Sequence, residues 1–82
     1  MRKYKPKYSK PLTDIEKETL CLLCFENADI AIITYRSIKA IRQCRNIIFK
    51  KLEVHSRAEA LITAIRQGII EIWDVVLPTD EF

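Results

Sequence analysis

The 82-residue sequence has only one glycine and three prolines, and it lacks any apolar run long enough to cross a membrane. Few glycines and prolines leave few turns, which favours helices over a series of short strands. A membrane-spanning helix needs about 20 predominantly apolar residues. The basic start of the sequence is not followed by the apolar stretch of a secretory signal. We therefore expect an all-α protein of the cytoplasm without a membrane segment.

Residues that carry catalysis or hold metal ions are also sparse. The sequence has one histidine, His55, and it shows no nucleophile paired with a base, no glycine-rich phosphate loop and no convergent carboxylates. Cys21 and Cys24 form a C-x-x-C pair, but they lie in an apolar stretch, and a structural zinc site needs four ligands. We interpret them, with Cys44, as small core residues of a reduced protein. We expect no enzyme, metal, cofactor or small-molecule ligand.

The charge is unevenly distributed, although the net charge is only +3. Residues 1–11 include five basic residues and no acid, and residues 36–57 include seven basic residues and one acid. Residues 68–82 include four acids and no base. A basic segment that also forms a helix indicates a polyanionic partner, and the alternative is an ordinary solvated face.

Capping residues and apolar periodicity predict four helices. The predicted helices cover residues 14–25, 28–33, 38–52 and a last stretch that begins after Ser56 and ends at Gly68. The first and the last begin with a capping box, in which Thr or Ser is followed three residues later by Glu. These short, capped helices are typical of a small all-α domain.

Composition divides the chain into three parts. These are a basic N-terminal arm (1–11), a helical domain (12–70) and an apolar and acidic C-terminal extension (71–82). Pro6 and Pro11 exclude a regular helix from the arm, whose charge serves either solubility or added contacts with phosphates and the minor groove. The apolar stretch 69–77 is expected to extend the last helix, to form a short strand or to cover a partner subunit.

The predicted helix 38–52 has two distinct faces. Its core face has apolar residues three and four positions apart, namely Ile41, Cys44, Ile48 and Leu52. The opposite face is polar and basic, and consists of Lys39, Arg42, Gln43, Asn46 and Lys50. No acid lies between Ser37 and Leu52. Because Arg pairs bidentately with guanine, and Asn or Gln with adenine, this face predicts a helix that lies in the major groove of DNA.

Five short motifs follow one another through the helical domain. They are Leu12-Thr13 with Glu16, Glu18, Leu20, Leu22 and Leu23; Asn27-Ala28-Asp29-Ile30-Ala31; Ser37 with Lys39-Ala40-Ile41-Arg42; Lys51-Leu52-Glu53-Val54; and Ser56-Arg57-Ala58-Glu59-Ala60. In this order they resemble the helix-turn-helix DNA-binding domain of the LuxR/NarL/GerE type over residues 12–70. The resemblance implies a four-helix domain in which the second and third helices form the helix-turn-helix. It also implies dimerisation, largely through the fourth helix.

The resemblance assigns roles to three sets of residues. The residues expected to read bases are Arg42, Gln43 and Asn46. The residues expected to contact phosphates are Lys39, Arg45, Lys50 and Lys51. The expected dimer interface consists of Leu61, Ala64, Ile65, Ile72 and Trp73.

We therefore expect a bacterial transcription regulator that binds double-stranded DNA sequence-specifically, as a homodimer on a pseudo-palindromic site. It shows no receiver or ligand-sensing domain, so abundance or a regulatory protein partner is expected to set its activity. The alternative is a protein-interaction module that uses a degenerate helix-turn-helix fold and docks through its apolar tail. Arg36 and Arg45, which stand where the family is usually apolar, favour the alternative. A sigma-factor-like promoter-binding piece is a third interpretation, which the motif at 56–60 argues against.

Overall fold

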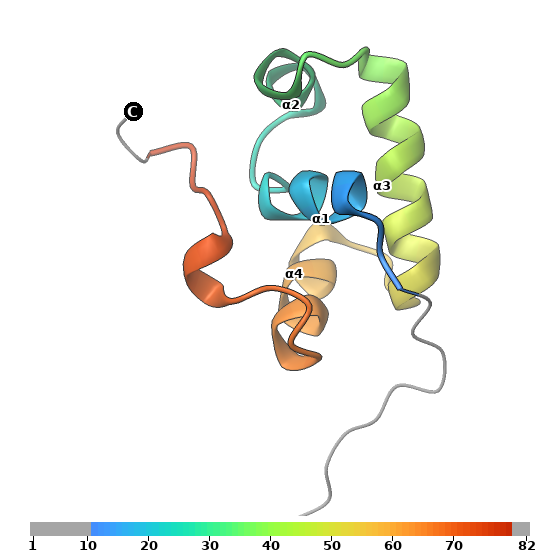
Figure 1. Cartoon of the computed structure of the whole chain (residues 1–82), viewed down its shortest axis with the longest axis vertical. Coiled ribbons are helices and arrows are strands. Elements are labelled where there is room, and N and C mark those ends of the chain that lie inside the picture. The colour runs from blue at the N-terminus through green and yellow to red at the C-terminus, as the bar shows by residue number, and fades with distance from the viewer. Residues whose placement is uncertain (1–10, 80–82) are drawn as a thin grey trace, which may run out of the picture.

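The computed structural model describes residues 11–79, and within them the chain is all-α, with no β-strand. The helices are α1 (Asp14–Cys21), α2 (Asn27–Thr34), α3 (Ile38–Leu52) and α4 (Arg57–Arg66), followed by a short 3-10 helix, η1 (Ile72–Asp74) (Figure 1). The all-α prediction is thus confirmed for this part of the chain. None of its helices is both long and apolar enough to cross a membrane. The expected arm, apart from Pro11, and the last three residues lie outside the described range.

Side-chain caps begin three of the four α-helices at the predicted places. The hydroxyl oxygens of Thr13, Ser37 and Ser56 accept hydrogen bonds from the backbone N–H three residues later. These bonds satisfy N–H groups that have no partner within the helix. Helix α3 covers the predicted range 38–52 at both ends, and α2 is one residue longer than predicted at each end.

Helix α1 ends at Cys21, four residues before the predicted end at residue 25. The chain continues in tight turns, in which Leu22 N–H donates to Thr19 O and Phe25 N–H donates to Leu22 O. Leu22, Leu23 and Phe25 are all buried. A continued helix would direct these neighbouring side chains to different sides, whereas the turns bury all of them. Tertiary packing therefore ends α1 before its local propensity would.

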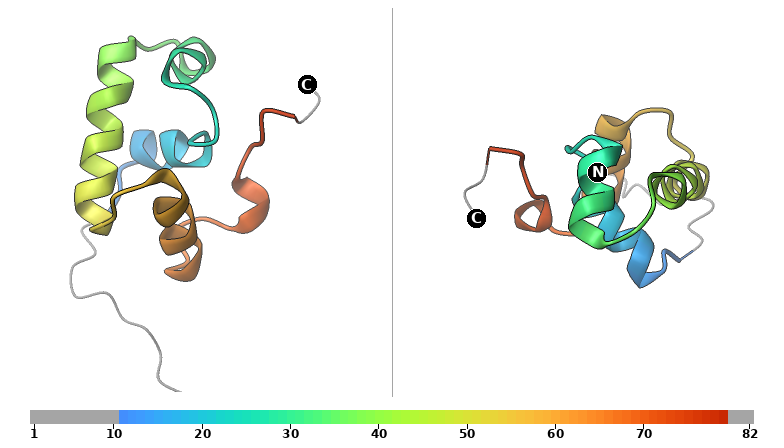
Figure 2. Two further views of the ribbon diagram at one scale, coloured as in Figure 1. Left: turned by 180° about the vertical axis from the view of Figure 1, so that it is seen from behind. Right: turned by 90° about the horizontal axis from the view of Figure 1, so that it is seen from above.

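Helix α3 packs against each of the other three α-helices. Helix α2 lies at its N-terminal end, α1 near its middle and α4 towards its C-terminal end (Figures 1 and 2). The predicted core face of α3 is buried and contributes to two apolar clusters. Ile41 joins the cluster with α2, whereas Cys44, Ile48 and Leu52 join the cluster with α1 and α4.

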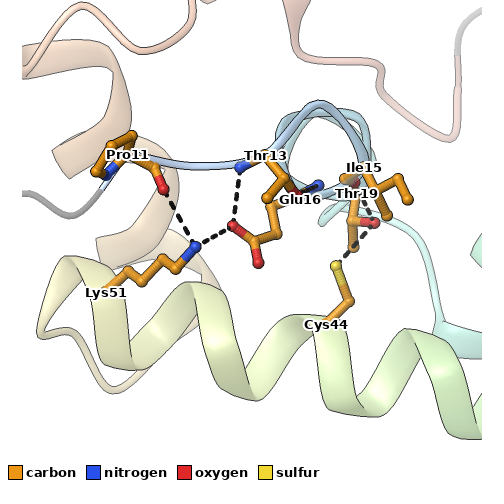
Figure 3. Close-up of polar contacts among 7 residues, drawn as sticks. All are labelled: Pro11, Thr13, Ile15, Glu16, Thr19, Cys44 and Lys51. Carbon is orange, nitrogen blue, oxygen red and sulfur yellow. Dashed lines mark hydrogen bonds and ion pairs between the residues drawn. The ribbon is translucent and has the colours of Figure 1, made fainter.

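A buried carboxylate ties the start of α1 to the end of α3 (Figure 3). Glu16 is 7% exposed, and its Oε1 accepts a hydrogen bond from Thr13 N–H at 3.0 Å. Lys51 Nζ lies 2.7 Å from the same oxygen and also donates to Pro11 O at 3.1 Å. Burial raises the pKa of Glu16, but the hydrogen bonds from Lys51 and Thr13 and the charge of Lys51 outweigh it, so the pKa is lowered overall.

The tail folds back onto its own chain, and it neither extends α4 nor forms a strand. It leaves α4 at Gly68, whose φ of 74° is a left-handed conformation that glycine adopts without strain. Beyond η1, Val76 N–H donates to Cys21 O at 3.0 Å, and Val75 packs against the larger core cluster. In all three views η1 lies on the opposite side of α1 and α4 from α3 (Figures 1 and 2).

The lowered pKa of Glu16 predicts a specific sensitivity to acid. The ionised carboxylate stabilises the fold above its ordinary pKa of 4.5, and this contribution is lost as the pH falls through the lower pKa of the folded state. Glu16→Gln should reduce the free energy of unfolding at neutral pH by about 1–3 kcal/mol, because Lys51 loses a charged partner. Urea titrations should also show a smaller loss of stability for the variant than for the wild type between about pH 5 and pH 2.

The exposed Glu53 provides the control for this experiment. Glu53→Gln removes one carboxylate without disturbing the buried contact, so its acid sensitivity should match that of the wild type. Equal acid sensitivity of Glu16→Gln and the wild type would contradict the assigned role of Glu16.

Candidate nucleic-acid interface

The outer face of α3 carries basic and amide side chains that point away from the core. All five residues predicted on this face are exposed: Lys39, Arg42, Gln43, Asn46 and Lys50. Helix α3 contains no acidic residue in any turn, so no neighbour on the same helix neutralises its cations. The structure therefore presents together the three residues expected to read bases and two of those expected to contact phosphates.

A polar hollow opens beside this face, where the first residue of α2 approaches α3. It has a volume of about 250 Å³ and is lined by Asn27, Arg42, Arg45, Asn46 and Phe49. Arg45 Nη1 donates to Asn27 Oδ1 at 2.6 Å, and its guanidinium carbon lies 5.6 Å from the centroid of the Phe49 ring. The hollow thus combines a positioned guanidinium with the exposed one of Arg42. Guanidinium and amide donors in this arrangement match the acceptor oxygens of a phosphate.

The charge of Arg45 lies in an unfavourable environment. Burial lowers its pKa, and the positive charge of nearby Arg57 lowers it further, whereas the negative charge of Glu26 opposes both. Arginine stays protonated in proteins, so the contacts with Asn27 and Phe49 hold a cation that burial and Arg57 disfavour. A bound anion would improve that environment, which agrees with the expected phosphate contact of Arg45.

Lys51 differs from the expectation that it contacts a phosphate. Its side chain is only 19% exposed and is used inside the chain, where it pairs with Glu16 and Pro11 O. Releasing it would leave a buried carboxylate without its cation, which is costly. We therefore do not retain Lys51 as a phosphate contact. Arg36 is also used internally, since its Nη1 lies 2.6 Å from Glu18 Oε1 of α1.

The residues expected at a dimer interface divide into two groups. Ala64 is fully buried in the core, so the expectation that it contacts a partner is corrected: its methyl group packs within its own chain. Three of the others, Leu61, Ile65 and Ile72, line an apolar groove of about 290 Å³ between α4 and the tail, whereas Trp73 does not. The groove is lined by Leu61, Ile65, Ile72, Val75 and Leu77. Trp73 follows Ile72 in η1 and is 77% exposed.

Sequence reasoning missed four residues of these two hollows. Asn27 and Phe49 line the polar hollow, and Val75 and Leu77 line the apolar groove. Val75 and Leu77 belong to the apolar stretch 69–77, so the composition carried a signal, but the return of the tail to α1 depends on tertiary contacts. Asn27 entered the sequence analysis only as the first residue of the motif at 27–31, and no local pattern links it to Arg45.

The cysteines show no arrangement for chemistry. Burial raises the pKa of Cys21, and the negative charges of Asp74 and Glu18 raise it further, which favours the unreactive thiol. Cys44 is buried and its Sγ lies 3.4 Å from Thr19 Oγ1 (Figure 3). Among residues 11–79, no three His, Cys, Asp or Glu side chains are grouped so as to hold a metal ion. The interpretation of Cys44 as a core residue is confirmed.

The turn between α2 and α3 contains a strained residue. Tyr35 ends α2 with φ 57° and ψ 41°, and it is 96% exposed. A left-handed conformation costs a residue with a Cβ atom roughly 1–2 kcal/mol, whereas glycine adopts it readily. The packing of the core does not require the Tyr35 side chain, because almost all of it is in solvent.

Tyr35→Gly is therefore expected to stabilise the protein by about 1 kcal/mol. Tyr35→Ala keeps the Cβ atom and the strain, so its stability should stay close to that of the wild type. Urea titration of both variants measures the difference. A loss of stability in Tyr35→Gly would mean that the tyrosine side chain makes a contact that supports the fold.

The comparisons with known proteins assign no family. No protein-family model matches the sequence, and no curated protein or solved structure is significantly similar to the chain. The outer face of α3, the polar hollow and the apolar groove are therefore the features on which a function can be based.

Proposed function

We propose that the protein is a sequence-specific transcription regulator that binds DNA as a homodimer through a helix-turn-helix of the LuxR/NarL/GerE type. One observation carries the proposal: the outer face of α3 exposes Lys39, Arg42, Gln43, Asn46 and Lys50 together, on a helix without an acid. An ordinary solvated helix has acids among its bases. A face without them has an excess of positive charge that a polyanion neutralises.

The chemistry of this face fits base readout. The major groove is wide enough for an α-helix, and each base pair presents a distinct pattern of donors and acceptors there. Arg42 can donate two hydrogen bonds to guanine O6 and N7, and Gln43 or Asn46 can pair in the same way with adenine N6 and N7. The three-residue turn from α2 is short enough to keep the two helices together, as in a helix-turn-helix.

The flanks of the face fit the phosphate backbone. Lys39 and Lys50 lie near the two ends of α3, and the polar hollow with Arg45 lies beside it. Cations that contact phosphates release condensed counterions, so each contact makes binding more sensitive to salt. These contacts fix the register of the helix on the duplex, and the amide and guanidinium contacts with bases supply the specificity.

The apolar groove supports the homodimer part of the proposal. Its lining from α4 and the tail leaves apolar surface exposed, and a chain of this size buries a modest core and benefits from a partner. η1, which contributes Ile72 to the groove, lies on the opposite side of α1 and α4 from α3, so a second copy docked against the tail would leave α3 accessible (Figure 1). Two such faces related by a two-fold axis would read half-sites about one helical turn apart.

Fluorescence anisotropy with a pool of random duplexes tests the DNA-binding proposal. Wild-type binding should weaken steeply with salt, and sequence preference should be lost when Arg42→Ala and Asn46→Ala are combined. On a selected site, Arg42→Ala alone should cost about 1–3 kcal/mol and relax specificity at one base pair. Lys50→Ala should instead weaken all sequences evenly and lower the salt slope by about one.

Lys17→Ala is the matched control, because it removes an exposed cation from α1 and leaves α3 intact. Its affinity and base preference should match those of the wild type. A folded wild-type protein that binds no duplex at low salt would contradict the proposal.

A second function, a protein-interaction module, is favoured by one specific observation. Trp73, which follows the groove residue Ile72, is 77% exposed, and exposed tryptophans often anchor protein partners. Arg45 and Arg36 make contacts inside the chain, as expected if these positions serve the fold rather than DNA. In this case the tail would be the functional surface, and α3 would only support it.

Trp73→Ser distinguishes the role of this surface. In a homodimer we expect the variant to raise the dimer dissociation constant at least about tenfold, measured by analytical ultracentrifugation, because a tenfold change corresponds to about 1.4 kcal/mol. Binding to a palindromic duplex should weaken, whereas binding to a single half-site should not change. Ile62→Ser, at an exposed isoleucine of α4, is the control for the loss of an exposed apolar side chain outside the tail. A dimer that is insensitive to Trp73→Ser would contradict this interface.

A further inference from the structure

The first residue of α3 is an exposed isoleucine that the core does not explain. Ile38 is 43% exposed, whereas the apolar residues on the core face of α3 are buried. Ile38 and Lys39, the first two residues of α3, are both exposed to solvent. An exposed isoleucine side chain leaves apolar surface in water, and a partner that covered this surface would bind favourably.

Ile38 belongs to the same row of side chains as the residues proposed to read bases. Positions four residues apart lie next to one another on a helix, so Ile38, Arg42, Asn46 and Lys50 form one continuous ridge. Three members of the ridge are polar or basic, and the member at the N-terminal end is apolar. A recognition helix contacts base edges mainly with its N-terminal residues, where Ile38 lies.

We infer that Ile38 reads the 5-methyl group of a thymine in the site contacted by Arg42 and Asn46; the inference rests on the proposed DNA-binding function. Thymine is the base that presents an apolar group in the major groove, and apolar side chains recognise it by contact with that methyl group. The ridge would then distinguish bases by two kinds of contact, hydrogen bonds and apolar contact. Hydrogen bonds from Arg42 and Asn46 select guanine and adenine, and apolar contact from Ile38 selects thymine.

Ile47 offers a control of the same residue type on the same helix. It is 42% exposed, almost as much as Ile38, but it lies nine residues further along. At 3.6 residues per turn this is about two and a half turns, so Ile47 flanks the outer face on the edge opposite Ile38, next to Gln43 and away from Arg42. A generic effect of removing an exposed isoleucine from α3 should appear in both variants, whereas a thymine contact should appear in Ile38 alone.

The test replaces thymine with deoxyuridine, which removes only the methyl group and keeps the base pair. A site is first selected from random duplexes with the wild-type protein. Each thymine of that duplex is then replaced in turn, and affinity is measured for the wild type, Ile38→Ala, Ile38→Val and Ile47→Ala. We expect one thymine in each half-site at which replacement weakens wild-type binding about fourfold, the factor that corresponds to about 0.8 kcal/mol for one buried carbon group.

Ile38→Ala should bind the thymine and deoxyuridine duplexes equally at that position, whereas Ile38→Val and Ile47→Ala should retain the wild-type preference. Selective, salt-sensitive binding that no thymine replacement alters would overturn the inference and leave the proposed function intact. The same preference in Ile38→Ala as in the wild type would also overturn it. A folded wild-type protein that binds no duplex would instead remove the proposed function and the inference together.

Discussion

The burial of one stripe on α3 is the constraint on which the arrangement of the molecule depends. Ile41 belongs to the apolar cluster with α2, and Ile48 belongs to the cluster with α1 and α4, so a single helix holds both parts of the core. Once this stripe faces inward, helical geometry forces the residues half a turn away to face outward. The basic face is thus a consequence of the same packing that stabilises the fold, and its position does not depend on a mobile loop.

Polar contacts at both ends keep α3 in register with its neighbours. At the C-terminal end Lys51 pairs with the buried Glu16, and nearer the N-terminal end Arg45 donates to Asn27. Arg36 pairs with Glu18 just before α3 begins. The sequence presents these three residues as part of one basic segment, yet each is engaged within the chain. The charge available to a polyanion therefore excludes Lys51 and Arg36, and it is concentrated on the outer face of α3, with Arg45 in the polar hollow beside it.

The sequence predicted the features that depend on residues close together in the chain and missed those that depend on distant segments. The bounds of α3 and the caps at Thr13 and Ser56 were predicted because they depend on residues within one helical turn. The early end of α1 and the fold-back of the tail depend on contacts between distant segments, which no local pattern reveals. The burial of Ala64 was missed for a related reason: helical periodicity places a residue on a face, but only the tertiary packing decides whether that face meets its own chain or a partner.

The separation of the two candidate surfaces limits how the protein can be regulated. α3 and the tail helix η1, which contributes Ile72 to the apolar groove, lie on opposite sides of α1 and α4 (Figure 2). A small partner bound in the groove would therefore not cover the residues of α3 that are proposed to contact DNA. Such a partner could change DNA affinity by displacing a second copy, since a dimer binds two half-sites and a monomer only one. Under the proposed function, control would thus act through the assembly state and would leave the face proposed to read bases unchanged.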